Sequence, residues 1–174
     1  QFNADIIGED DPAADAELIS VAIDTMLALG FTEKDFVVRA SDRESWLKFC
    51  SENNVEDTTG FLGVIDKIER DKPEVVSKKL AKYNLTSEFV HAFINDPKNA
   101  SPAFKQIQKN LEARGLGKYL KLDLTIVRGL AYYTGTVFEI FDTSHSMRAV
   151  AGGGRYDDLL KSLSNGIVDL PCTG

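Results

Sequence analysis

The chain has 174 residues, of which 43% are apolar and 9% aromatic, and its formal net charge at pH 7 is −7. This apolar content supports a buried core and excludes a disordered chain, while the apolar runs are too short to cross a membrane. Two cysteines are too few for a disulfide scaffold, so we expect a reducing, cytoplasmic compartment. The chain begins with Gln1 and shows no leader pattern, which we interpret as a piece of a longer protein.

The charge is unevenly distributed along the sequence. Residues 66–121 contain 12 Lys and Arg against 7 Asp and Glu, a net charge of +5, whereas the rest of the chain has a net charge of −12. An acidic protein therefore holds a basic middle segment.

The first third of the sequence predicts alternating strands and helices. Rough alternation up to Ile7 indicates the end of a strand, and an Asp-Pro pair then predicts a helix from Pro12 that closes at Gly30. Residues 36–40 are rich in β-branched and aromatic side chains and predict a strand. Ser41 and Glu44 have capping-box spacing, which predicts a helix running to about residue 53.

The rest of the chain divides into a helical stretch and a strand-rich stretch. Short helices interrupted by Pro and Gly are expected at about 59–70, 71–83, 86–95 and 101–115. Period-two alternation then predicts strands at 122–126, 136–142 and 148–151. Because these strands follow one another without helical crossovers, we expect an antiparallel sheet, followed by a short helix over 157–163.

Two runs contain residue types suited to ligand binding. Residues 127–139 place Arg128 beside a glycine, and an Arg fork matches a phosphate or a carboxylate in a bidentate way. Residues 151–157 contain Gly152, Gly153 and Gly154, which let backbone N–H groups approach a ligand. Taken alone, each run also fits an ordinary hairpin.

Other classes of site lack their patterns. The glycine run is neither a P-loop nor a dinucleotide fingerprint, and no GxSxG nucleophile elbow is present. His91 and His145 have no Cys or carboxylate at ligand spacing, so no metal site is predicted.

Taken together, the two runs resemble the histidine-binding signatures of histidyl-tRNA synthetases. The first is Arg-Gly-Leu-Ala-Tyr-Tyr-Thr-Gly at 128–135, and the second is Gly-Gly-Arg-Tyr-Asp at 153–157. The opening of the chain is similar to the end of that family's motif 2. The resemblance implies an α+β fold, namely the class II synthetase antiparallel sheet flanked by helices, with a small all-helical insertion. It implies core segments at 1–42 and 119–174 and an insertion at 43–118.

The resemblance also implies an activity. Histidine would react with ATP, which carries Mg²⁺, to give histidyl-adenylate, and the histidyl group would pass to the 3′ end of histidine tRNA. The family acts as a homodimer in the cytoplasm, and no protein ligand for Mg²⁺ is identifiable in this chain. These 174 residues contain neither motif 1, nor the ATP-clamping Arg of motif 2, nor the Arg of motif 3, nor an anticodon-binding domain, so we expect them alone to be inactive.

Residue roles carry over by position. Arg128 would stabilise charge on the substrate carboxylate and the α-phosphate as the catalytic residue. Tyr133 and Asp5, which stands where the family usually has Glu, would hold the imidazole nitrogens. Three further residues would complete the histidine site: Gln1, Tyr132 and Tyr156. Gly152, Gly153 and Gly154 would form an adenylate-binding loop that Arg155 orients, and Lys78, Lys79 and Lys82 would contact tRNA.

Two related readings remain open. One is the regulatory subunit of ATP phosphoribosyltransferase, which binds ligands of the histidine pathway without acylating tRNA. The other is a synthetase-like domain that senses uncharged tRNA. The complete first signature and the helical insertion favour the synthetase.

Overall fold

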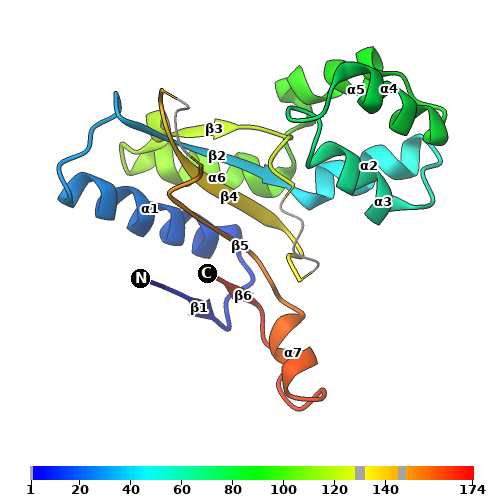
Figure 1. Ribbon diagram of the computed structural model, residues 1–174. Coiled ribbons are helices and arrows are strands. Elements are labelled where there is room, and N and C mark those ends of the chain that lie inside the picture. The colour runs from blue at the N-terminus through cyan, green and yellow to red at the C-terminus, as the bar shows by residue number, and fades with distance from the viewer. Residues whose placement is uncertain (1, 128–131, 145–147) are drawn as a thin grey trace.

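The computed structural model describes residues 2–127, 132–144 and 148–174. Within them a mixed sheet is covered by helices on one face, and a separate group of short helices lies beyond one end of the sheet (Figure 1). The predicted α+β class with a mainly antiparallel sheet is confirmed. The chain passes through β1 (Ile6–Ile7), α1 (Pro12–Ala28), β2 (Phe36–Asp42), α2 (Arg43–Glu52), α3 (Thr58–Ile65), α4 (Pro73–Leu80), α5 (Ser87–Asn95), α6 (Pro102–Ala113), β3 (Leu120–Leu122), β4 (Thr136–Asp142), β5 (Ala151–Gly154), α7 (Leu159–Leu163) and β6 (Cys172–Thr173).

The central sheet has the strand order β3-β2-β4-β5. β4 pairs antiparallel with both β2 and β5, whereas β3 pairs parallel with β2. The expectation of three consecutive antiparallel strands is therefore wrong for the first of them. β3 also ends at Leu122, because the Asp123 side chain accepts from the backbone N–H of Thr125 and turns the chain out of the sheet.

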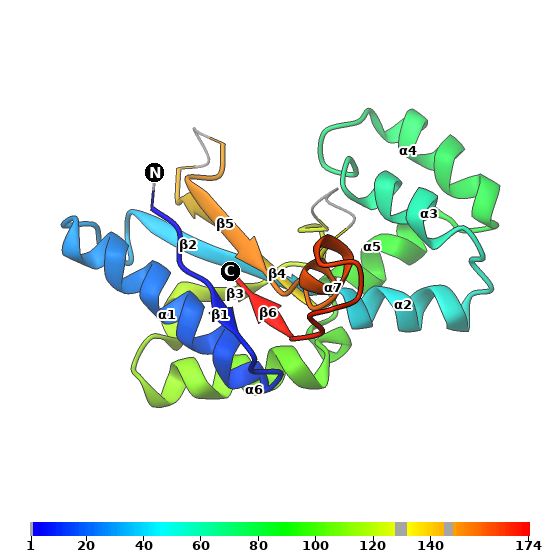
Figure 2. The same ribbon diagram turned by 90° about the horizontal axis from the view of Figure 1, so that it is seen from below.

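A second, two-stranded sheet joins the two ends of the chain. β1 pairs antiparallel with β6, with Ile6 opposite Thr173. Reciprocal backbone hydrogen bonds between Gly154 and Gly174, at 2.9 and 3.1 Å, attach β6 to the end of β5. Segments at opposite ends of the sequence therefore meet beside the glycine strand, as Figure 2 shows.

The core that supports the sheet comes from α1 and α6. Both helices lie on the same side of the sheet (Figures 1 and 2), and their apolar faces pack against Val38, Phe138 and Ile140. α1 begins at Pro12 because the Asp11 side chain accepts from Ala13 N, as the sequence predicts. α6, which the predicted boundary at 43–118 places in the insertion, packs within this first core.

The helices α2 to α5 form a second core of their own. Trp46 is fully buried at its centre and contacts the rings of Phe49, Phe61 and Phe93 at centroid distances of 5.6, 5.7 and 5.1 Å. The N-cap of α2 is Asp42, whose carboxylate accepts from Glu44 N at 2.7 Å, and not the predicted Ser41. Ser41 is instead the penultimate residue of β2, and its hydroxyl donates to Ile126 O.

Candidate functional site

Asp5 and Tyr156 meet beside the small sheet. Asp5 lies immediately before β1, and Tyr156 follows β5 by two residues; the Tyr156 hydroxyl donates to Asp5 Oδ1. Burial and the neighbouring Asp5 carboxylate raise the pKa of Tyr156 well above its ordinary value, so the phenol stays protonated at neutral pH. A Cβ at Gly174 would lie 2.0 Å from Asp5 Oδ1 and 2.5 Å from Tyr156 Oη, so a side chain there would displace one or both of these groups.

Two further tyrosines complete an aromatic cluster at this place. The rings of Tyr132 and Tyr133 lie 4.7 Å apart, and the Tyr132 ring meets the edge of Tyr156 at 6.2 Å. Tyr133 is 6% exposed and packs with Ile126 and Val137, whereas Tyr132 is 39% exposed. The structure therefore brings together four of the predicted histidine-site residues from three distant parts of the sequence.

The glycine run lies in a strand, so the prediction of a loop is wrong. Gly153 and Gly154 belong to β5 and pair with Phe138 and Val137 of β4. A Cβ at Gly154 would lie 2.5 Å from Thr136 O and 2.9 Å from the Tyr133 ring. A Cβ at Gly153 would lie 2.2 Å from Gly174 O. These two glycines permit close packing of the protein on itself.

Arg155 connects the glycine strand to α1. Its Nε and Nη2 both donate to Asp15 Oδ2, at 3.0 and 2.9 Å, and its Nη1 donates to Asp157 Oδ1 at 3.2 Å and to Glu9 O at 3.1 Å. Burial raises the pKa of Asp15, although Thr173 and Arg155 oppose this shift. Arg155 is only 7% exposed. Its guanidinium therefore points into the protein, toward Asp15 and Asp157.

The second signature is fixed to the first by several bonds. Thr134 N donates to Arg155 O, and Arg155 N donates to Thr136 O, both at 2.8 Å. Asp157 N donates to Thr134 Oγ1 at 3.1 Å. The residues that follow the tyrosine pair are therefore hydrogen-bonded to the residues that follow the glycine strand.

Not every predicted residue is brought to this place. Arg128 and Gln1 lie outside the described residues, so their roles stay predictions. The three predicted tRNA contacts lie on and just after α4, at the surface of the helical group and far along the molecule from β5 (Figure 1); they are Lys78, Lys79 and Lys82. Lys79 pairs with Asp71 at 2.6 Å and holds the pKa of that carboxyl below its ordinary value, while Lys78 and Lys82 are exposed.

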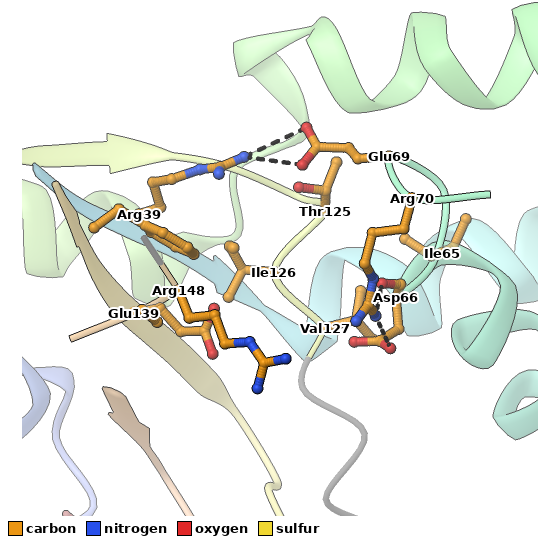
Figure 3. A pocket seen from close by; sticks show the side chains of 12 residues that line it. Arg39, Ile65, Asp66, Glu69, Arg70, Thr125, Ile126, Val127, Glu139 and Arg148 are labelled. Atoms are coloured by element: carbon orange, nitrogen blue, oxygen red, sulfur yellow. Dashed lines mark hydrogen bonds and ion pairs between the residues drawn. The ribbon is translucent and has the colours of Figure 1, made fainter. Parts of the chain in front are cut away.

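Two cavities border the region. One, of about 560 Å³, is lined by Asp5, Gly152 and Gly174 together with apolar side chains of α1 and β4. The other, of about 550 Å³, lies between β4 and the end of α3 (Figure 3). There Arg39 points to Glu69, and Arg70 bonds back to Asp66 within its own turn. The sequence did not predict this charged cavity.

Sequence reasoning missed some partners that shape the site. No role is predicted for Asp15 from the sequence, yet this residue is the buried partner of Arg155. The one available signal is a carboxylate beside the apolar stripe of the helix. Among the described residues, no group of three or more His, Cys, Asp or Glu is arranged to hold a metal ion. Within the same residues, no helix is long and apolar enough to span a bilayer.

Comparison with known proteins agrees with the signatures. The family model for histidyl-tRNA synthetase matches residues 72–174. The chain belongs to the histidyl-tRNA synthetase family. A histidine–tRNA ligase of Opitutus terrae is 36% identical over the whole chain, and the chain covers 45% of that protein. This chain thus spans less than half the length of that relative of the family.

Solved structures show the same fold. A histidyl-tRNA synthetase from Nostoc matches with a TM-score of 0.80 at 21% identity, covering 97% of this chain and 46% of that one. A protein from Bacillus halodurans described as an ATP phosphoribosyltransferase regulatory subunit/histidyl-tRNA synthetase matches with a TM-score of 0.72 at 21% identity, covering 97% of this chain and 48% of that one. At this identity both comparisons bear on the fold alone.

Proposed function

We propose that this chain provides the histidine-binding part of a histidine–tRNA ligase. The observation that carries the proposal is the convergence of Asp5, Tyr132, Tyr133 and Tyr156 beside the glycine strand. Family membership and the 36% identical ligase support the same activity. The full reaction is ATP-dependent formation of histidyl-adenylate, followed by transfer of the histidyl group to histidine tRNA.

The chemistry of the pocket suits an imidazole. Histidine differs from other side chains in offering one ring N–H donor and one ring acceptor at neutral pH. The Asp5 carboxylate can accept from the ring N–H, and Tyr156, which stays protonated, holds that carboxylate in place. A tyrosine hydroxyl, which we assign to Tyr133, would donate to the other nitrogen. A site built to hydrogen-bond both ring nitrogens disfavours a substrate that lacks them, because its polar groups would then stay unpaired.

The remaining roles follow the family positions. Arg128 would stabilise negative charge on the α-phosphate and the carboxylate, and Gln1 would contact the substrate's amino or carboxylate group. Gly152 would let the adenylate approach β5. Mg²⁺ would enter with the phosphates of ATP. The homodimer and the cytoplasmic location of the family are part of this proposal.

Exchange of the Asp5 carboxylate tests the proposal. In the full-length protein that carries this chain, Asp5→Asn should raise the KM for histidine in ATP–pyrophosphate exchange by about 10- to 100-fold, since a hydrogen bond to a charged group contributes about 1.5–3 kcal/mol. The KM for ATP should stay within about twofold, because the change leaves the phosphate contacts intact.

Asp10→Asn is the matched control, because Asp10 is an exposed acidic residue of the same segment. It should leave both KM values unchanged. A wild-type protein that binds histidine but shows no pyrophosphate exchange would favour the regulatory-subunit alternative. An unchanged histidine KM in Asp5→Asn would contradict the assigned pocket.

A further inference from the structure

The junction of β2 and α2 holds both flanks of the first histidine signature. Residues 41–46 form this junction, where the last strand residues pass directly into the helix. Its side chains and backbone bond to residues 124–126 before the signature and to residues 133–136 at its end. One short segment thus bonds to the chain before the signature and to the chain at and after Tyr133.

Three of these bonds lie on the Tyr133 side. The guanidinium Nη1 of Arg43 donates to Tyr133 O at 2.8 Å, and Arg43 N donates to Gly135 O at 3.2 Å. The Thr136 hydroxyl donates to Asp42 Oδ2 at 3.0 Å. The Arg43 side chain therefore acts directly on the backbone of a residue that forms the histidine pocket.

Two more bonds lie on the other side. Ser41 Oγ donates to Ile126 O, and Trp46 Nε1 donates to Leu124 O at 2.9 Å, with all four residues buried. Ile126 packs against the Tyr133 ring. The segment that precedes the signature therefore also packs against Tyr133.

The Arg43 guanidinium is not needed to start α2. Asp42 already caps that helix through its bond to Glu44 N, and the second core packs around Trp46 without Arg43. Arg43 is only half-buried. Among the described residues, its side chain hydrogen-bonds to Tyr133 O alone, so its removal should act on the tyrosine before it acts on the fold.

We propose that Arg43 is a positioning residue for histidine recognition: it fixes the backbone of Tyr133 and thereby the Tyr133 ring relative to Asp5 and Tyr156. This inference rests on the proposed function, because Tyr133 must face the substrate. Displacing a recognition group by about 1 Å can reduce catalytic efficiency up to about 100-fold. Because the phosphate contacts are elsewhere, the loss should fall on histidine and not on ATP.

The experiment compares Arg43→Gln, Arg43→Lys and Lys48→Gln in the full-length protein. Lys48 is an exposed residue of the same helix, so its variant also removes one positive charge. Arg43→Gln should raise the histidine KM in pyrophosphate exchange about 10-fold and leave the ATP KM within about twofold. Arg43→Lys should recover part of this loss because an ammonium can donate to the same carbonyl. Lys48→Gln should match the wild type.

A histidine KM within twofold of wild type in Arg43→Gln would overturn the proposal. So would equal increases in both KM values, because these would show a general loss of structure. If the wild-type protein shows no ATP–pyrophosphate exchange, the proposed function fails. Amide hydrogen exchange in the same full-length protein then decides the positioning role. Faster exchange at 133–136 in Arg43→Gln than in Lys48→Gln then supports that role, and equal rates overturn it. Arg43→Lys serves in the same comparison if Arg43→Gln does not fold.

Discussion

Gly154 lies so close to β4 and to Tyr133 that a side chain at this position would collide with both. The atoms that a Cβ would meet are a backbone carbonyl in a paired strand and an aromatic ring that is itself packed. Neither can move without disturbing the sheet or the tyrosine cluster. The absence of a side chain at Gly154 therefore allows β5 to pair with β4 while the Tyr133 ring lies against it.

We predict that Gly154→Ala lowers the free energy of unfolding by about 1–3 kcal/mol, the usual effect of overpacking a core. It should also weaken histidine binding, because the Tyr133 ring must shift. Urea denaturation and histidine titration of the full-length protein measure the two effects.

Gly63→Ala is the control for this change. Gly63 lies in α3, and no atom lies within 4 Å of the position that a Cβ would take, so alanine there should stabilise the helix by up to about 1 kcal/mol. If Gly154→Ala were as stable as Gly63→Ala, the close approach to Thr136 O would have no energetic consequence.

For single residues, sequence motifs indicate which side chains belong to the candidate site but not which distant side chains those residues will contact. The two signatures select Tyr132, Tyr133 and Tyr156, the resemblance to motif 2 selects Asp5, and these residues do meet in space. The Asp15–Arg155 ion pair is not predictable in the same way because its members are 140 positions apart. Periodicity indicates which face of a helix is buried, but it carries no information on which distant side chain will meet that face.

Among the elements, α6 shows how a local signal can be right while its tertiary assignment is open. Ser101 and Pro102 predict the start of this helix, and Ser101 Oγ accepts from Phe104 N at 3.0 Å. Position in the sequence alone groups the helix with the insertion. Its apolar face instead packs against α1 and the sheet, a choice that the helix pattern alone cannot make.

We predict that Ser101→Ala destabilises the protein by about 1 kcal/mol, because a buried N-cap hydroxyl would be lost. Ser77→Ala, at an exposed position inside α4, should leave stability unchanged or slightly higher. Equal unfolding midpoints for the two variants in urea would mean that the cap does not contribute to the first core.

The prediction of a strand at 122–126 is correct only for its first part. Alternation at Leu122, Leu124 and Ile126 predicts one strand, but only its first part pairs in the sheet. Leu124 instead enters the second core and Ile126 packs on Tyr133. Alternation reports that every second residue is buried, and a turn that sends its residues into two different cores satisfies the same pattern.

At the scale of the whole molecule, the basic segment spans both cores. Lys78 and Lys82 lie one turn apart and are exposed on the second core, whereas Lys79 is paired with Asp71. Charge counting identifies the segment but cannot separate free cations from paired ones. We therefore test the predicted tRNA contacts first at Lys78 and Lys82.

We predict that Lys78→Gln with Lys82→Gln weakens tRNA binding and reduces the slope of log affinity against log salt by about 1 to 2, because each lost phosphate contact removes somewhat less than one released ion. Pyrophosphate exchange should be unaffected, since it requires no RNA. Binding of histidine tRNA across a salt series measures the change.

A double variant of equal charge, Lys34→Gln with Lys161→Gln, controls for overall charge because both positions lie outside the second core. The same slope in the two double variants would show that the lysines of α4 are ordinary surface charges.

The two cores differ in how far apart their residues lie in the sequence. The second core takes almost all its side chains from residues 46–94, so it can form from nearby contacts. The first core joins residues near 16–40 to residues near 138–140 and must close a long loop. On the ribosome, the second core can therefore assemble before the central strand has its antiparallel neighbour. Until β4 has been synthesised, one edge of β2 stays unpaired and open to association with other nascent chains.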